Sequence, residues 1–181
     1  MDHRHIANLT LVAETPRFAD RWTRMFVTGW RASMSVTMMS GSYFTVYTGV
    51  DNALTGENGT TQRANLLLAN VYGTKDPNNY LVRSPFGSPA PGTYGNLGNA
   101  AIEGPGLLQV NSSLSRAFRI KERHTVEVRA DASNLLNRVN LSLPNNTLTS
   151  PTFGQVTSDI SPTLNQAGDP RILQFSMKYV F

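Results

Sequence analysis

The sequence RILQFSMKYVF, residues 171–181, alternates apolar and polar side chains one by one. One set of positions holds Leu173, Phe175, Met177, Tyr179 and Phe181, and the other holds Gln174, Ser176 and Lys178. Neighbouring side chains on a β-strand point to opposite faces of the sheet. This stretch therefore predicts a strand with one apolar and one polar face.

The same alternation recurs along the chain. In TVEVRADAS, residues 125–133, Val and Ala alternate with Glu127, Arg129 and Asp131. Five strands are expected in all, near residues 5–14, 26–39, 107–120, 124–136 and 170–181. These stretches have the length of a membrane-crossing strand, about 9–11 residues or more. Strands of globular proteins are usually shorter, at about 5–6 residues.

A soluble antiparallel sheet shows the same alternation, so the pattern alone does not decide between the two classes. Two details favour a membrane barrel. Charges of both signs lie in the middle of the expected strands, as suits a wet lumen. Large aromatic residues lie near strand ends, as in the interface girdles of outer-membrane barrels: Trp22, Trp30, Phe118, Tyr179 and Phe181.

The connections between the expected strands alternate in length. A tight turn near residues 121–124 and a modest turn near residues 16–24 alternate with two long stretches, residues 49–106 and 137–169. In an antiparallel meander, alternate connections lie on the same side of the sheet. Short periplasmic turns and long extracellular loops are typical of outer-membrane barrels. This arrangement places the C-terminus in the periplasm.

Composition excludes several other classes. Charged residues make up 15% of the 181 residues, against about 25% in soluble domains. The net charge of +4 is scattered, so nucleic acid is not an expected partner, and the absence of Cys excludes disulfide frameworks. The sequence has no run of about 18 apolar residues, so no membrane-spanning helix is predicted. Because the N-terminus does not read as a signal peptide, we expect the chain to be a fragment of a longer protein.

Several segments resemble TonB-dependent receptors, in particular the Oar-like group with a carboxypeptidase-regulatory-like domain. They are SGSYFTV (40–46), APGTYGNLG (90–98), GPG (104–106), RADASNLLN (129–137), SPTFGQV (150–156) and the last strand. The resemblance covers nearly the whole chain in the same order. One departure is Ser133, where the group usually has an aromatic residue.

The resemblance implies that residues 1–181 are the all-β, antiparallel C-terminal part of a transmembrane β-barrel of roughly 22 strands with a plugged lumen. It implies a Gram-negative outer-membrane location and transport of a scarce nutrient. Expected partners are outer-membrane lipid, the barrel-assembly machinery and, through an upstream plug, the TonB complex. The assembly machinery is expected to read the lipid-facing residues of the last strand, which are Phe175, Met177, Tyr179 and Phe181.

Candidate site residues follow from the same pattern. Lumen-facing positions are expected at Glu127, Arg129, Asp131, Gln174 and Lys178. Lipid-facing positions are expected at Val126, Val128, Ala130, Leu173, Phe175 and Met177. In the long loops, the aromatic residues offer stacking surfaces for a ligand, although they also suit packing of the loops: Tyr72, Tyr80, Phe86, Tyr94 and Phe153. The ligand itself is not readable from these residues.

No catalytic or metal-binding set is expected. His3 and His5 are spaced to share a strand face, but no third ligand accompanies them, and the strand-associated His residues lie only at strand ends. The sequence therefore predicts no enzyme and no cofactor. The alternative to a transporter segment is a soluble or secreted β-sandwich that binds carbohydrate or mediates adhesion. That alternative also accommodates long loops, but it does not account for the terminal aromatic strand.

Overall fold

The computed structural model describes residues 3–16, 18–57, 61–121, 124–160 and 170–181. Over these residues the chain is all-β, apart from one six-residue helix. The chain divides into two compact units. The loop unit comprises Met1–His5, Met39–Leu107 and Asn140–Gly168. The sheet unit comprises Ile6–Met38, Leu108–Val139 and Asp169–Phe181.

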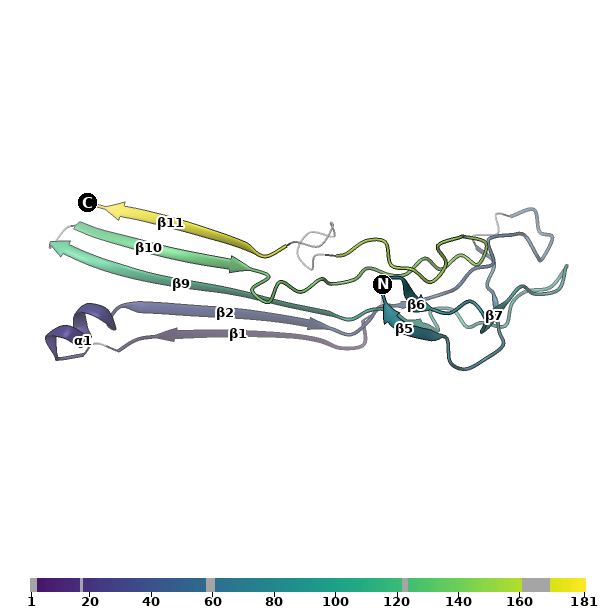
Figure 1. Ribbon diagram of the computed structural model, residues 1–181, viewed down its shortest axis with the longest axis horizontal. Helices are drawn as coiled ribbons and strands as arrows, with labels where there is room; N and C mark the ends of the chain where they lie inside the picture. The colour runs from purple at the N-terminus through teal and green to yellow at the C-terminus, as the bar shows by residue number, and fades with distance from the viewer. Residues whose placement is uncertain (1–2, 17, 58–60, 122–123, 161–169) are drawn as a thin grey trace. The chain divides into compact units, whose positions relative to one another are not determined.

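The sheet unit is a single five-stranded sheet with the strand order β1-β2-β9-β10-β11. Adjacent strands run in opposite directions (Figure 1). The bounds are β1, Ile6–Glu14; β2, Trp30–Met39; β9, Leu107–Lys121; β10, His124–Ser133; and β11, Ile172–Val180. The order follows the chain without a crossover, so this part of the fold is the expected antiparallel meander.

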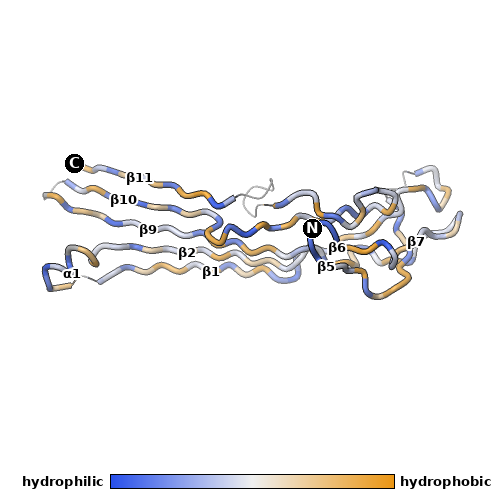
Figure 2. The backbone as a smooth tube through the Cα atoms, in the orientation of Figure 1, coloured by the Kyte–Doolittle hydropathy of each residue, from blue (hydrophilic) through white to orange (hydrophobic). Residues whose placement is uncertain are grey.

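The register assigns alternate residues of neighbouring strands to the same face, because directly opposed side chains in a ladder point the same way. Val128 is opposite Met177, and Ala130 is opposite Phe175. Hydropathy alternates along these strands (Figure 2). We call one side the apolar face; it includes Leu114, Phe118, Val126, Val128, Ala130, Leu173, Phe175, Met177 and Tyr179. The opposite side is the polar face; it includes Ser113, Ser115, Glu127, Arg129, Asp131, Gln174, Ser176 and Lys178.

The short connections and the C-terminus lie at one end of this sheet (Figure 1). Two residues, Glu122 and Arg123, separate β9 from β10 and lie outside the described residues. The β1–β2 connection contains helix α1, Arg21–Phe26. Asp20 caps this helix by accepting hydrogen bonds from the backbone N–H groups of Trp22 and Thr23 (3.0 and 3.1 Å). The Thr23 N–H is the main reason that the pKa of Asp20 is below its usual range.

Two expected strand ends were wrong. Residues 26–29 are not strand, because α1 extends to Phe26 and Gly29 turns the chain with φ +84°. Residues 134–136 are not strand either, because Asn134 adopts φ +47°. The Asn134 side chain then closes a turn, with its Oδ1 accepting from the Arg138 N–H and its Nδ2 donating to the Arg138 carbonyl, both at 3.0 Å. An Asn side chain tolerates this left-handed conformation better than most residues.

The long connections were expected as loops, and most of their described length is indeed irregular. The connection between β2 and β9 also contains short strands: β3, Tyr43–Phe44; β4, Asn65–Leu66; β5, Tyr72–Asp76; β6, Asn79–Leu81; β7, Phe86–Gly87; and β8, Ile102–Glu103. A hydrophobic core unites them, and it includes Phe44, Val46, Ala64, Val71, Leu81, Leu97, Ile102, Leu148 and Val156. Residues 161–169 of the second loop lie outside the described residues.

Gly154 joins the second long connection to β6. Its carbonyl accepts from the N–H groups of Tyr80 and Leu81 (3.0 and 3.1 Å), and its N–H donates to Asn145 (2.8 Å). Its φ of +78° and the closeness of the Leu81 carbonyl leave no room for a side chain. Residues from both long connections therefore make one folded unit.

Edge pairing generates the first prediction. Within the described residues, β1 and β11 are the two outer strands of the sheet, and each has one neighbour. Unpaired backbone groups cost several kcal/mol each in hydrocarbon. We therefore expect the 181-residue chain, refolded alone in detergent or lipid vesicles, to associate through these edges. Light scattering with cross-linking measures the association state. A monodisperse, heat-modifiable monomer that conducts ions would contradict the prediction, because it would require more strands than the five of the sheet unit.

Candidate functional site

The polar face of the sheet unit carries a shallow hollow of about 300 Å³. Its lining includes Thr10, Ser33, Ser35, Asn111, Ser113, Arg129, Asp131 and Ser133. Arg129 donates from Nε to both carboxylate oxygens of Asp131 (2.9 Å each), and the Ser33 and Ser113 hydroxyls lie 2.8 Å apart. The hollow therefore offers hydroxyls, an amide and a closely paired charge to a polar solute.

The structure places all five expected lumen-facing residues on this one face. Glu127 lies opposite Lys178, and Asp131 lies opposite Gln174. Arg129 lies between them on β10 and pairs with Asp131. The side chains of Arg129 and Asp131 are 51% and 34% exposed, so the pair is solvated and adds little to stability. Across the described residues, no group of three His, Cys, Asp or Glu side chains is placed to hold a metal ion.

The apolar face is strongly exposed. Phe175 and Met177 are 78% and 76% exposed, and Leu114 is 43% exposed. A groove of about 460 Å³ lies along this face, and its lining includes Trp30, Leu114, Val128, Phe175 and Met177. Contiguous apolar surface of this kind marks a contact with a membrane or with another protein.

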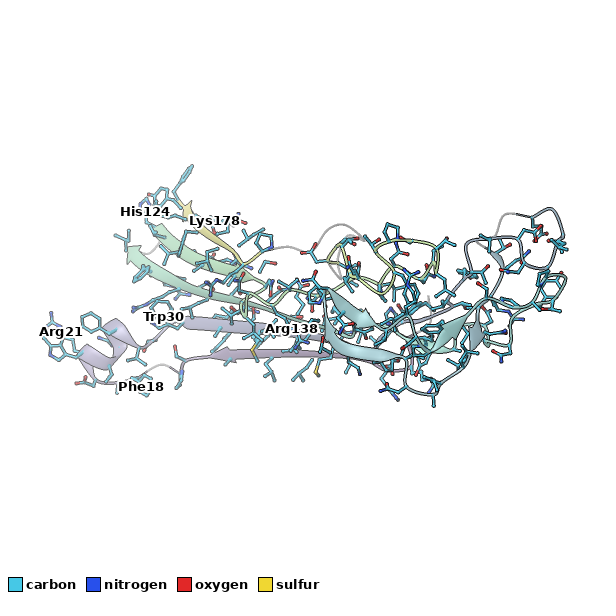
Figure 3. The ribbon with its side chains drawn as sticks, turned by 45° about the vertical axis from the view of Figure 1, so that its right-hand side comes forward. Phe18, Arg21, Trp30, His124, Arg138 and Lys178 are labelled. Carbon is cyan, nitrogen blue, oxygen red and sulfur yellow. The ribbon has the colours of Figure 1, made fainter. Side chains whose placement is uncertain are left out.

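The C-terminal aromatic residues form a stack that includes His124, a residue the sequence placed only in a turn. The rings of His124 and Tyr179 are 5.8 Å apart and almost parallel, and the Tyr179 hydroxyl lies 2.6 Å from His124 Nδ1. Phe181 stacks on Tyr179 at 5.9 Å and is 89% exposed. Figure 3 labels His124 and Lys178 at the same end of the sheet. The register shift between His124 and Thr125, which the sequence does not reveal, accompanies this pairing.

Arg116 is a second residue whose role the sequence did not reveal. It lies opposite Val128 on the apolar face, where the alternation predicts an apolar residue. It is 9% exposed, and its guanidinium lies over the rings of Trp30 (5.3 Å) and Phe118 (4.6 Å). It also donates to the carbonyl of Phe26 (3.2 Å), the last residue of α1. The alternating pattern of this strand marked Arg116 as an exception, but helix α1, whose carbonyl it binds, was not predicted.

Most of the aromatic residues proposed as ligand contacts belong to the core of the loop unit, so that expectation was wrong for them. Tyr80, Phe86 and Phe153 are buried, and Phe86 packs edge-to-face on Phe153 at 5.7 Å. Burial raises the pKa of Tyr80 to about 12 and also raises the pKa of Tyr72. The half-buried Tyr72 donates its hydroxyl hydrogen to the Glu103 carbonyl at 3.1 Å.

Tyr94 differs from the other four, because it is 70% exposed. Two residues further on, the Asn96 side chain accepts from the Leu66 N–H (2.7 Å), and the Asn96 N–H donates to the Asn65 side chain (2.9 Å). Leu67 and Leu68, which follow Leu66, are 62% and 58% exposed. Tyr94, Leu67 and Leu68 thus lie outside the core of the loop unit, and the sequence pattern did not distinguish them from core residues.

Comparison with known proteins gives the family. No curated protein and no solved structure matches the chain. In the described residues, no helix has both the length and the hydrophobicity to span a membrane. Residues 1–174 match the model of the outer membrane beta barrel domain. A match to an outer-membrane family excludes the soluble β-sandwich alternative, and it agrees with the apolar and polar faces of the sheet. The chain therefore belongs to the outer membrane beta barrel domain family and is located in the outer membrane.

Proposed function

We propose that this chain is the C-terminal barrel segment of a TonB-dependent transporter of the Oar-like group, which takes up a scarce nutrient. The observation that carries the proposal is the asymmetry of the connections. Both long connections contribute to one folded loop unit, whereas the β1–β2 and β9–β10 connections are short. A folded set of extracellular loops suits ligand capture, and short periplasmic turns with long extracellular loops are typical of outer-membrane barrels.

In this proposal the apolar face contacts lipid and the polar face lines the lumen. The lumen-facing residues are Glu127, Arg129, Asp131, Gln174 and Lys178. The Arg129–Asp131 ion pair is compatible with a water-filled lumen, whereas its burial in hydrocarbon would cost free energy. The exposed side chains of Phe175 and Met177 suit acyl chains instead.

Ligand capture is assigned to the loop unit. Tyr94, Leu67 and Leu68 replace the buried aromatic residues as candidate contacts, because their side chains are accessible. We propose no enzymatic role for the chain. On the polar face the Arg129 and Asp131 charges are paired with each other. Further proposed partners are the barrel-assembly machinery and, through an upstream plug, the TonB complex.

Energy dependence tests the transport proposal. Cells that lack the gene for the full protein should grow poorly when one specific nutrient is limiting. Removing TonB in the same cells should add nothing to that defect, because both losses block one uptake step. Growth curves of the two single mutants and the double mutant across limiting nutrients provide the measurement. Additive defects would reject TonB-dependent uptake and leave the barrel assignment intact.

The next prediction concerns the orientation of the two faces. Met177→Arg puts a charge on the apolar face and should cost up to roughly 2–4 kcal/mol, the figure for the bilayer midplane, with a smaller cost toward the interface. Ser176→Arg, the matched control, puts the same charge next to it on the polar face, beside Arg129. Urea titration of folding into lipid vesicles compares the two variants. Equal losses would argue against a lipid-facing apolar side.

The last strand generates a separate prediction. Deleting Phe181 should lower the amount of folded protein in the outer membrane, because this exposed ring and Tyr179 end the strand that the assembly machinery reads. Tyr179→Ala should act in the same direction. Val180→Ala is the control, since Val180 is opposite Thr125 and points to the other face. Heat-modifiable migration of outer-membrane fractions measures the folded amount; unchanged levels after deletion would remove the C-terminal signal.

A further inference from the structure

Helix α1 is held by two side chains at its C-terminal end. The carbonyl of Phe26 accepts from Trp30 Nε1 (2.9 Å) and from the Arg116 guanidinium (3.2 Å). The last carbonyls of a helix have no partner within the helix, and a cation there also complements the helix dipole. Arg116 lies on the apolar face, so the end of α1 lies on that side of the sheet. Figure 3 shows Arg21 of α1 and Trp30 at the same end of the sheet unit.

The side chains of α1 divide into two groups. Trp22 and Phe26 are one turn apart, and their rings stack with centroids 6.4 Å apart and an angle of 2°. They remain 69% and 60% exposed. At about 100° per residue, Arg24 lies on the opposite side of the helix, and Arg21 lies beside it. The helix is short, amphipathic and basic.

The C-terminal end of α1 is joined to the apolar face of the sheet through the Phe26 carbonyl. Arg116 contacts both the helix end and the rings of Trp30 and Phe118. Because the family is located in the outer membrane, the surface next to the apolar face is a lipid surface. Aromatic rings prefer the boundary between headgroups and acyl chains, and arginines prefer lipid phosphates. The aromatic and basic groups of α1 match both layers of that boundary.

We propose that α1 is an interfacial anchor. Trp22 and Phe26 insert at the edge of the acyl chains, while Arg21 and Arg24 face the phosphates of the same leaflet. Arg116 is the positioning residue that fixes the helix to the sheet. This inference rests on the proposed lipid contact of the apolar face.

The anchor also explains why an arginine lies on an apolar strand face. An arginine costs far less near the membrane interface than at the midplane. Its stem lies along apolar surface while its head reaches polar partners. Lipid contact alone predicts that Arg116→Leu is harmless or favourable. Positioning by Arg116 predicts instead that α1 leaves the membrane boundary in this variant.

Single-cysteine labelling tests the anchor, since the chain has no cysteine of its own. An environment-sensitive fluorophore is attached to the full chain carrying Trp22→Cys, Phe26→Cys or Arg24→Cys. The chain is folded into vesicles of phosphatidylethanolamine with phosphatidylglycerol, where association through the β1 and β11 edges leaves both faces of the sheet open to the quenchers. Quenching by a lipid-attached nitroxide and by aqueous iodide is then compared. Phe175→Cys and Gln174→Cys report on the two faces of the sheet in the same vesicles.

The anchor predicts lipid quenching at positions 22 and 26, and iodide quenching at position 24. Arg116→Leu should shift the label at position 22 from lipid quenching to iodide quenching; Ser115→Leu, on the polar face, should not. Iodide quenching at 22 and 26 together with lipid quenching at 175 would overturn the anchor and leave the proposed function standing. Absence of lipid quenching at 175 would overturn both. An unchanged label in Arg116→Leu would overturn the positioning role.

Discussion

Backbone hydrogen bonding is the constraint on which the rest of this structure depends. Hydrocarbon offers no partner to an N–H or C=O group, so a chain that crosses a bilayer as strands must pair each strand on both sides. The meander β1-β2-β9-β10-β11 meets this need for its inner strands and leaves the outer edges of β1 and β11 for other strands. The described sheet is therefore suited to a larger closed barrel.

Strand pairing also gives the sheet one apolar face and one polar face. Because opposed residues share a face, one register, Val128 with Met177 on β10 and β11, is enough to place most apolar side chains of the two strands together. A shift by one residue would put Arg129 and Asp131 among lipid tails. In the proposed arrangement lipid covers the apolar face, so this face needs no second layer of protein. The hydrophobic core of the described residues lies instead in the loop unit.

The sequence predicted the strands and their faces well, because a period of two is a local signal. It predicted less well wherever the structure depends on distant contacts. The cap that Asp20 gives to α1 was present in the sequence, but a six-residue helix leaves almost no periodic signal. Aromatic residues are common both in cores and on binding surfaces, so the sequence alone does not tell which role a loop aromatic has. A contact such as that of Phe86 with Phe153 depends on the fold of the whole loop unit. Arg116 appeared as an exception until α1 supplied its partner.

The central claim is that one face of this sheet meets lipid and the other meets water. Nitroxide labels placed one at a time along β11, Ile172–Val180, test it most directly in the membrane-inserted protein. The account predicts that collision with oxygen, which concentrates in lipid, and with a water-soluble nickel complex alternates with a period of two. Oxygen should dominate at Leu173, Phe175 and Met177. Equal accessibility at successive positions, or nickel dominating at these three, would contradict the account.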